Sequence, residues 1–499
     1  MAYLSKRSSK LSPSPKKYDA IIFDLGDVLF AWSALTKTSI SPQVLRSIIQ
    51  STTWFKYERG EISEEECYAT VALEKCISVN DVRRAFQEAR ESLTSQPLMT
   101  DLIRELKPGR GIYAMSNISA EDFAFLQTVK SSDMDLFDHC FTSSAAGKRK
   151  PDILYFHHVL ERTGADPSRT IYVDDKLSNV QAACSLGMAG ILYEDFKTVE
   201  RTLRNLCFDS TSRGESFLKR HAGQHLSYTS TGVVIYENFA QLLILEATRD
   251  PSLVKYTRYN GPFNFFRGVG ELTTRDFPCD VDTTSIGITC SDYMSLAMKN
   301  QVMDAILDLR NPDGIPQVYF DASRPRTDPA VCVNVLTLFH KHSRGQQLKK
   351  CLEWVESVLR YRGFSKGTRY YEPPEAFLFF LTRLFQVAPD VHKRLAPVFA
   401  DCCRERLGIK GDALALAMRV VCCNFAGINA SGDLLTLQSM QEIDGGWPDG
   451  WFYKYGLNGI RIANRGFTTA IAINAIKGEE TFVNDKPVTV ESYRGTGTR

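Results

Sequence analysis

The stretch AIIFDLGDVL at residues 20–29 decides how the first part of the chain folds. Its apolar, β-type residues run directly into Asp24, which is typical of a buried strand that ends in a polar loop. Two later runs, at residues 111–115 and 170–173, also end in polar residues. This alternation predicts a doubly wound α/β domain with a parallel sheet. The helical patterns between the runs lie at residues 41–50, 63–73 and 152–163.

Polar side chains follow each of these three strands. Asp24 follows the first, Ser116 the second, and Asp174 and Asp175 the third. In a parallel sheet the carboxyl ends of the strands meet at one edge, where ligands bind. Carboxylates that converge there would repel one another unless a hard cation such as Mg²⁺ lies among them. Lys150 could hold a phosphoryl group at this edge, and Asp24 could attack it to form an aspartyl-phosphate.

This pattern resembles the haloacid dehalogenase-like superfamily over about residues 18–200, in the four motifs that bear its chemistry. They are residues 23–29, Ser116, Lys150 and Asp174-Asp175, in that order. The resemblance implies a Rossmann-like phosphatase domain at residues 18–207 with a helical cap at about residues 31–106. It also implies a Mg²⁺ site made by Asp24, the carbonyl of Gly26, and Asp175 with Asp174 in support. Asp24 would be the nucleophile, and Ser116 and Lys150 would hold the phosphoryl oxygens.

One position departs from the superfamily pattern. Its phosphatases usually carry a second Asp two places after the nucleophile as general acid/base, and this chain has Gly26 there. Asp27 is one position further on, and strand alternation predicts that it points elsewhere. Some relatives with the Asp-x-Gly pattern are still phosphatases. An active phosphatase and a scaffold that has lost its activity therefore both remain open.

The second half of the chain is patterned as helices. From residue 208 to 230 the periodicity weakens and Ser, Thr, Arg and His accumulate, which predicts a linker. No strand run of comparable strength follows, so we expect an all-α domain at residues 231–499. Paired helices packed as an α/α barrel are compatible with the spacing. The expected helices lie at residues 239–248, 295–309, 330–339, 346–359, 374–385, 390–407 and 412–424.

The informative segment of this half is DVDTTS at residues 280–285. Two aspartates and three hydroxyl residues ahead of an apolar run suit a helix N-cap, because their oxygens accept the free N–H groups of the first turn. The same arrangement suits the protonation of an alkene. That reaction needs one carboxylic acid kept un-ionised beside a second carboxyl group. Composition alone favours the cap.

Aromatic residues crowd the flanks of this segment and the C-terminal part of the chain. Ring faces stabilise a carbocation by cation–π attraction. An aromatic core explains the same composition. The residues are Phe263, Phe265, Phe266, Phe277, Trp447, Trp451, Phe452, Tyr453, Tyr455 and Phe467.

Residues 280–285 resemble the D-x-D-T-T variant of the D-x-D-D motif of class II terpene cyclases, and residues 319–329 and 444–448 resemble other segments of such cyclases. With a dehalogenase-like domain ahead of it, the chain is similar to the drimane-type sesquiterpene synthases over about residues 18–480. The resemblance implies that Asp282 protonates farnesyl diphosphate and that Asp280, Thr283 and Thr284 orient and tune this acid. The product would be a bicyclic drimenyl or albicanyl diphosphate, which the first domain would dephosphorylate to the alcohol.

Two alternatives remain beside this bifunctional enzyme. One is a cyclase that releases the diphosphate because its N-terminal domain is an inactive scaffold, and the other is a small-molecule phosphatase with an all-α interaction domain. For the cyclase, basic and aromatic side chains must hold the substrate. The candidates are Arg267, Arg324, Arg369, Trp447, Trp451 and Phe452, with Arg275, Arg326 and Arg461 as further arginines.

Composition excludes several other classes. The 499 residues carry a net charge of +2, so no overall field favours nucleic acid or an anionic membrane. Thirteen cysteines without a secretory signal predict reduced thiols and a cytoplasmic location. Residues 1–17 read as a disordered tail, and the apolar run at 413–428 is too short and too interrupted to span a bilayer. We expect no stable membrane insertion, and the oligomeric state is open.

Overall fold

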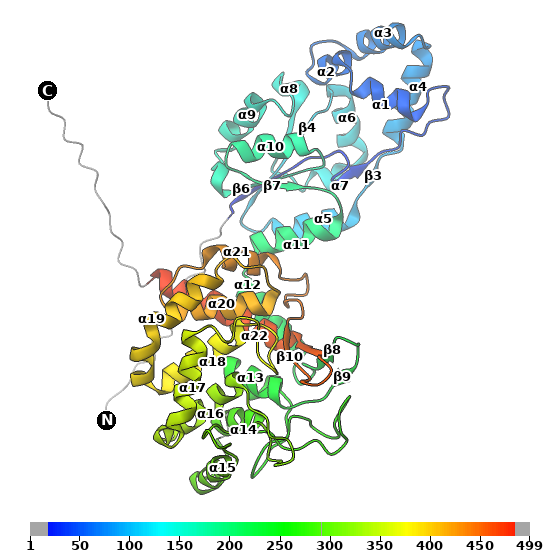
Figure 1. Ribbon diagram of the computed structural model, residues 1–499. Coiled ribbons are helices and arrows are strands. Elements are labelled where there is room, and N and C mark those ends of the chain that lie inside the picture. Colours follow the sequence, from blue (N-terminus) through cyan, green and yellow to red (C-terminus); the bar gives the residue numbers. More distant parts are fainter. Residues whose placement is uncertain (1–17, 291, 485–499) are drawn as a thin grey trace, which may run out of the picture. The chain divides into compact units, whose positions relative to one another are not determined.

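The computed structural model describes residues 18–290 and 292–484 (Figure 1). One compact unit ends at Phe208 and a second begins at Asp209. The tail expected at residues 1–17 lies outside the described residues. Among the helices that the structure describes, none combines the length and the apolar character needed to cross a membrane.

The first unit is built on a five-stranded parallel sheet in the order β5-β4-β1-β6-β7. In the central strand, Ile21 and Phe23 pack on one face and Ile22 on the other. Both faces are buried, which explains why these strands are continuously apolar. The predicted doubly wound α/β fold is therefore confirmed. The strands are β1 (Ala20–Phe23), β4 (Gly111–Ser116), β5 (His139–Thr142), β6 (Thr170–Asp174) and β7 (Ala189–Leu192).

Helices cover the two faces of this sheet. On the Ile21 face pack α5 (Pro97–Leu106), α6 (Ala120–Val129) and α11 (Phe196–Cys207), and on the Ile22 face pack α9 (Ile153–Thr163) and α10 (Leu177–Ser185). Each of these helices follows a strand or precedes one, as a doubly wound sheet requires.

Four helices form a cap with a core of its own. They are α1 (Pro42–Ile49), α2 (Thr52–Glu58), α3 (Glu64–Lys75) and α4 (Val79–Glu91). The chain enters and leaves the cap through two short antiparallel strands, β2 (Phe30–Ala31) and β3 (Thr94–Ser95). The expected cap at residues 31–106 is too long, because α5 packs its Met99, Ile103 and Leu106 on the sheet core instead.

The second unit is a ring of helices, which confirms its predicted helical character. Successive inner helices contact one another and the last returns to the first, so the ring closes as an α/α barrel. The inner helices are the most buried: in α18 every residue from Glu375 to Phe385 is buried. They are α13 (Phe239–Thr248), α14 (Val281–Cys290), α16 (Pro329–Lys341), α18 (Glu375–Val387), α20 (Ala413–Phe425) and α22 (Arg465–Asn484).

Outer helices and a small sheet surround this ring. Outer helices are α12 (Ser210–Arg220), α15 (Leu296–Asp308), α17 (Lys349–Arg360), α19 (Pro389–Arg406) and α21 (Ser431–Ser439). An antiparallel sheet, absent from the all-α expectation, adds β8 (Ser227–Thr229), β9 (Val234–Ile235), β10 (Trp451–Lys454) and β11 (Arg461–Asn464). These strands are two to four residues long, which is too short to leave a clear period-two pattern in the sequence.

The linker expected at residues 208–230 is instead part of the second unit. Most of it forms α12 and β8, and α12 buries Phe217 and Leu218. Gly214 is the reason that α12 approaches α22 so closely: a Cβ at this position would lie 2.9 Å from Ile473 Cγ1. Some of the polar residues that suggested a linker, Ser210 and Thr211, are also buried, whereas Ser212, Ser216, Lys219 and Arg220 are exposed.

Candidate active sites

The first candidate site lies at the carboxyl ends of β1, β4 and β6. Lys150 is 1% exposed, and its Nζ lies 2.9 Å from Asp24 Oδ1 and 2.7 Å from Asp174 Oδ2. Ser116 ends β4 and lines the same cavity as Asp24 and Lys150. Burial raises the pKa of Asp24 to about 7, and the Lys150 ammonium opposes that rise. The structure therefore brings the predicted nucleophile and its two phosphoryl-holding partners together.

The two aspartates after β6 have different surroundings. Asp174 is fully buried, and its oxygens accept hydrogen bonds from Lys150, the Tyr172 hydroxyl at 2.6 Å and the Asn179 amide at 3.0 Å. Asp175 is partly exposed and pairs with Lys176. Oxygens of Asp24, Asp174 and Asp175 lie within 4.8 Å of one another, so these three carboxylates could hold a metal ion. An oxygen-only donor set of this charge fits a hard divalent cation.

Positions 26 and 27 differ from the expectation in one respect. A Cβ added to Gly26 would meet nothing within 4 Å, so this glycine leaves open space beside the nucleophile. Asp27 does not point away from the site as alternation predicts. It has a φ of 55°, because the chain turns directly after β1, and its side chain lines the cavity of Asp24. Burial and the nearby Asp175 carboxylate raise the pKa of Asp27.

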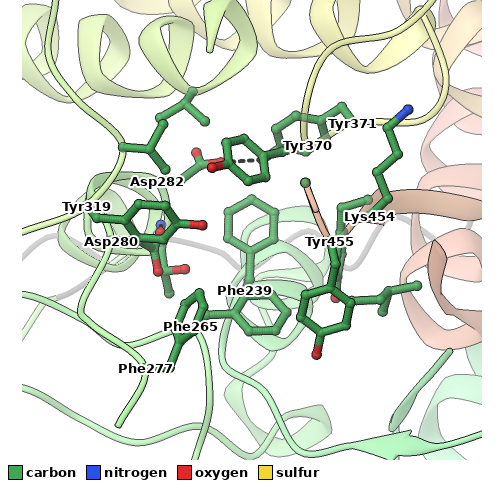
Figure 2. A pocket seen from close by; sticks show the side chains of 16 residues that line it. Phe239, Phe265, Phe277, Asp280, Asp282, Tyr319, Tyr370, Tyr371, Lys454 and Tyr455 are labelled. Atoms are coloured by element: carbon green, nitrogen blue, oxygen red, sulfur yellow. Dashed lines mark hydrogen bonds between the residues drawn. The ribbon is translucent and has the colours of Figure 1, made fainter. Parts of the chain in front are cut away.

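The second candidate site is an aromatic cavity in the helical unit, with a cavity volume of about 90 Å³ (Figure 2). Its walls carry Phe239, Phe265, Phe277, Tyr319, Tyr370, Tyr371, Tyr453 and Tyr455. Neighbouring rings meet edge to face, for example Phe277 and Tyr319 at 5.6 Å between centroids. Asp280 and Asp282 face this cavity.

Asp282 is held by partners that lie far away in the sequence. Its Oδ1 accepts a hydrogen bond from Asn334 Nδ2 at 2.7 Å, and its Oδ2 accepts one from the Tyr371 hydroxyl at 2.5 Å. Burial raises the pKa of Asp282 to about 6, and these two hydrogen bonds oppose the rise. Asp282 is therefore a buried carboxyl group that keeps its proton in mildly acidic solution.

Asp280 combines both roles that the sequence left open. It caps α14, because its Oδ1 accepts the Thr283 N–H at 2.6 Å, while its Oδ2 is buried and finds no hydrogen-bond partner within the described residues. Burial, together with repulsion from Asp282, raises the pKa of Asp280 to about 7. Thr284 turns away from the acid: its hydroxyl accepts the Phe263 N–H at 2.8 Å and fixes that loop.

A buried ion pair stands behind Asn334. Arg383 donates from Nε and Nη2 to the two carboxylate oxygens of Glu246, at 2.7 and 2.9 Å, and from Nη1 to Asn334 Oδ1 at 2.5 Å. Because arginine only donates, the Asn334 carbonyl must face Arg383 and its amide must face Asp282. This chain of contacts fixes Asp282 Oδ1 as an acceptor and leaves Oδ2 as the oxygen that can hold the proton.

The basic residues expected to hold the substrate lie at different places. Arg324 lies over the rings of Phe277 and Tyr319, both in the cavity wall, at 5.6 and 5.7 Å from their centroids. Arg369 lies over Tyr370, also in the wall, at 5.9 Å. Lys454 itself lines the cavity and pairs with Glu372 at 2.8 Å, and sequence reasoning missed it.

The other arginines make contacts away from the lining that the structure describes. Arg461 stacks on Trp451, with its guanidinium 4.6 Å from the ring centroid. Arg267, Arg275 and Arg326 are also outside the lining residues of the aromatic cavity. Arg326 still lies near it, because its backbone carbonyl accepts the N–H of Val318 in the wall.

The aromatic residues near the C-terminus divide between the two roles: Tyr453 and Tyr455 line the cavity, whereas Trp447 and Phe452 belong to the core. Trp447 is 0% exposed, and its Nε1 donates to the Leu437 carbonyl at 2.7 Å. Gly445 beside it has a φ of 91° and closely approaches the Arg213 carbonyl of α12, so this motif joins α12 to the barrel. Phe452 is also fully buried and supports the wall from behind, 5.2 Å from Tyr371. Trp447 and Phe452, expected to bind the substrate, are thus core residues, and the partly exposed Trp451 is also absent from the described cavity lining.

Two family models match the two units. The haloacid dehalogenase-like hydrolase model matches residues 18–187, and the sesquiterpene cyclase astC-like C-terminal domain model matches residues 211–342. Among solved structures, a magnesium complex of the HAD family enzyme bt-2542 from Bacteroides thetaiotaomicron is 22% identical, with a TM-score of 0.31. It covers 37% of this chain and 98% of that chain.

Curated relatives extend these matches to almost the whole chain. The sesquiterpene phosphatase astK of Aspergillus oryzae is 38% identical over 190 residues, which are 38% of this chain and 96% of that protein. The drimenol cyclase drtB of Aspergillus calidoustus is 43% identical over 465 residues, which are 92% of this chain and 88% of that protein. The chain therefore belongs to the family of drimenol cyclase drtB, with a haloacid dehalogenase-like unit followed by a sesquiterpene cyclase unit.

Proposed function

We propose that the helical unit cyclises farnesyl diphosphate to a bicyclic drimane-type diphosphate. The observation that carries this proposal is the carboxyl pair of Asp280 and Asp282, which is buried in the wall of an aromatic cavity. Asp282 donates a proton to the terminal alkene, two rings close, and loss of a proton ends the reaction. The diphosphate survives, because protonation and not ionisation starts the cyclisation.

The cavity supports each stage of this reaction. Burial keeps Asp282 protonated at a pH where an exposed aspartate is ionised. The ring faces in the wall stabilise the cationic intermediates without reacting with them. Lys454, with Arg324 and Arg369 over wall residues, supplies positive charge for the diphosphate.

The N-terminal unit then removes phosphate from the cyclised product. Asp24 attacks the terminal phosphorus of the diphosphate, the terpenyl monophosphate leaves, and water hydrolyses the aspartyl-phosphate to inorganic phosphate. A second round on the monophosphate releases the alcohol, and Ser116 and Lys150 hold the phosphoryl oxygens in both rounds. Asp24, Asp175 and the Gly26 carbonyl would bind Mg²⁺, with Asp174 in support, and the cation would supply charge that stabilises the ionised carboxylates and the phosphoryl oxygens. The product is then the free bicyclic alcohol, drimenol or albicanol.

A product assay tests both halves together. Purified protein is incubated with farnesyl diphosphate and Mg²⁺, and extracts are analysed by gas chromatography–mass spectrometry with and without added phosphatase. We expect a bicyclic alcohol in both samples. The alcohol only after added phosphatase would confine catalysis to the helical unit, and no terpenoid in either sample would refute the cyclase proposal.

The hydrogen bond from Tyr371 gives a pH test of the acid. This bond stabilises the ionised form of Asp282, so Tyr371→Phe should raise the pKa of Asp282 further. Because the acid works in its protonated form, cyclisation falls as pH rises through this pKa. The fall in kcat for bicyclic product should therefore occur at higher pH in Tyr371→Phe than in the unchanged protein.

Tyr370→Phe is the matched control, because Tyr370 lines the same cavity and donates no hydrogen bond to Asp282 among the described contacts. Its pH profile should keep the original midpoint. A profile of Tyr371→Phe that stays in place or moves to lower pH would contradict the assignment of Asp282 as the acid.

A further inference from the structure

A second cavity of the N-terminal unit lies between the cap and the sheet. It has a volume of about 240 Å³, and we call it the apolar chamber. Its walls include Leu25, Phe30 and Leu126 from the sheet core and Trp54 and Phe86 from the cap core. Ligand sites are typically concave and mostly apolar with a few polar groups, and this chamber has that character.

The charged groups in the chamber wall are already paired. Arg90 forms ion pairs with Asp122 and Glu64, and Glu58 pairs with Arg149 at 3.1 Å. Trp54 and Phe86 stack with their ring centroids 4.3 Å apart and form one continuous aromatic surface. A cavity with such walls binds apolar matter better than water.

The chamber opens into the phosphoryl site. Six residues line both this chamber and the cavity of Asp24 and Lys150, and they include Gly26, Ser116 and Asn117. Gly26 lies at the junction, where a Cβ would meet nothing within 4 Å. The missing side chain at this position, which removes the usual acid/base, therefore leaves a passage beside the nucleophile.

We propose that the apolar chamber binds the hydrocarbon body of a C15 terpenyl phosphate whose phosphoryl group lies at Asp24. The inference rests on the proposed phosphatase function and adds the site that selects its substrate. The occupant follows from continuity: a group in the chamber reaches Asp24 past Gly26, so only an apolar body joined to a phosphate fills both spaces. Ala89 of α4 lines the chamber and is 5% exposed, so a larger side chain there would fill it.

The test compares Ala89→Phe with a matched control, Gln87→Phe, which adds the same ring to the exposed side of the same helix. Both are made in full-length protein that carries Asp282→Asn, so that the probes are not cyclised. Phosphate release is measured for acetyl phosphate and for dimethylallyl, geranyl and farnesyl monophosphates. We expect Ala89→Phe to lower kcat/KM for farnesyl monophosphate by about tenfold or more. The loss should shrink as the chain shortens and vanish for acetyl phosphate, and Gln87→Phe should match the parent throughout.

The outcomes separate the two proposals. Equal farnesyl monophosphate hydrolysis by Ala89→Phe and its parent would overturn the chamber assignment and leave the phosphatase function standing. Equal loss on acetyl phosphate and farnesyl monophosphate would also overturn it, because damage to the catalytic site would then explain the effect. A parent protein that hydrolyses none of the four esters would refute the phosphatase function, and the chamber assignment with it.

Discussion

Asp282→Asn is expected to reduce the formation of bicyclic product from farnesyl diphosphate by about a thousandfold, the scale of a lost general acid. The amide keeps the size of the side chain and its contacts with Asn334 and Tyr371 but has no acidic proton to give. The loss corresponds to about 4 kcal/mol of transition-state stabilisation. Product is measured by gas chromatography–mass spectrometry after added phosphatase, so that the state of the N-terminal unit does not affect the result.

Asp280→Asn separates the acid from its neighbour. Asp280 caps α14, and among the described contacts it forms no hydrogen bond with Asp282. Its carboxyl group nevertheless faces the same cavity, and its Oδ2 has no hydrogen-bond partner among the described residues. We expect about a tenfold loss, the scale of a pKa change of one unit in the acid. A reversed order, with Asp280→Asn inactive and Asp282→Asn active, would make Asp280 the proton donor.

The fold could be predicted from the sequence where a helix or strand is buried and its residues are therefore mostly apolar. The run at β1 is continuously apolar because both faces of the sheet are covered, and the inner helices α16 and α18 are mostly apolar because they are buried around nearly their whole circumference. Helix α12 was hidden, because its buried side has only two large apolar residues, Phe217 and Leu218, and its polar residues resemble a linker. The strands β8 to β11 were hidden because they are short.

The site was predictable only where its residues are close in the sequence. Asp280 and Asp282 lie in one motif, whereas Asn334 and Tyr371 reach Asp282 from 52 and 89 positions away. The sequence nevertheless contains a feature that could have identified residues around Asp282. Asn334 and Arg383 are polar residues inside otherwise apolar inner helices, and a buried polar group must find a partner.

The aromatic residues were harder to sort. Composition marks aromatic residues as a group, but only the fold distinguishes Tyr371, which lines the cavity, from Trp447, which packs under α12. Arginine has the same ambiguity, since Arg324 and Arg461 both stack on rings and only the rings under Arg324 belong to the wall. Residue type therefore predicts the chemistry available to a site, and the closed ring of helices determines which of the aromatic residues and arginines lie at the cavity.

Asp24→Asn is expected to stop phosphate release while leaving cyclisation unchanged. Loss of the nucleophile should lower alcohol formation by about a thousandfold or more. The substitution should be tolerated, because burial already raises the pKa of Asp24 to about 7 and Lys150 keeps its second partner, Asp174, at 2.7 Å. The measurement is liquid chromatography–mass spectrometry of the diphosphate, monophosphate and alcohol made from farnesyl diphosphate.

Asp101→Asn is the matched control, since Asp101 belongs to the same unit, is exposed and forms an ion pair with Arg104 on the same helix. It should give the product pattern of the unchanged protein.

Asp27→Asn addresses the missing acid/base, because Asp27 lines the nucleophile's cavity while position 26 has no side chain. If Asp27 takes over that role, its loss should slow release of the alcohol from the monophosphate more than release of the monophosphate from the diphosphate, since an alkoxide needs a proton to leave and a phosphate does not. Alcohol formation by Asp24→Asn at the unchanged rate would instead make the N-terminal unit a scaffold.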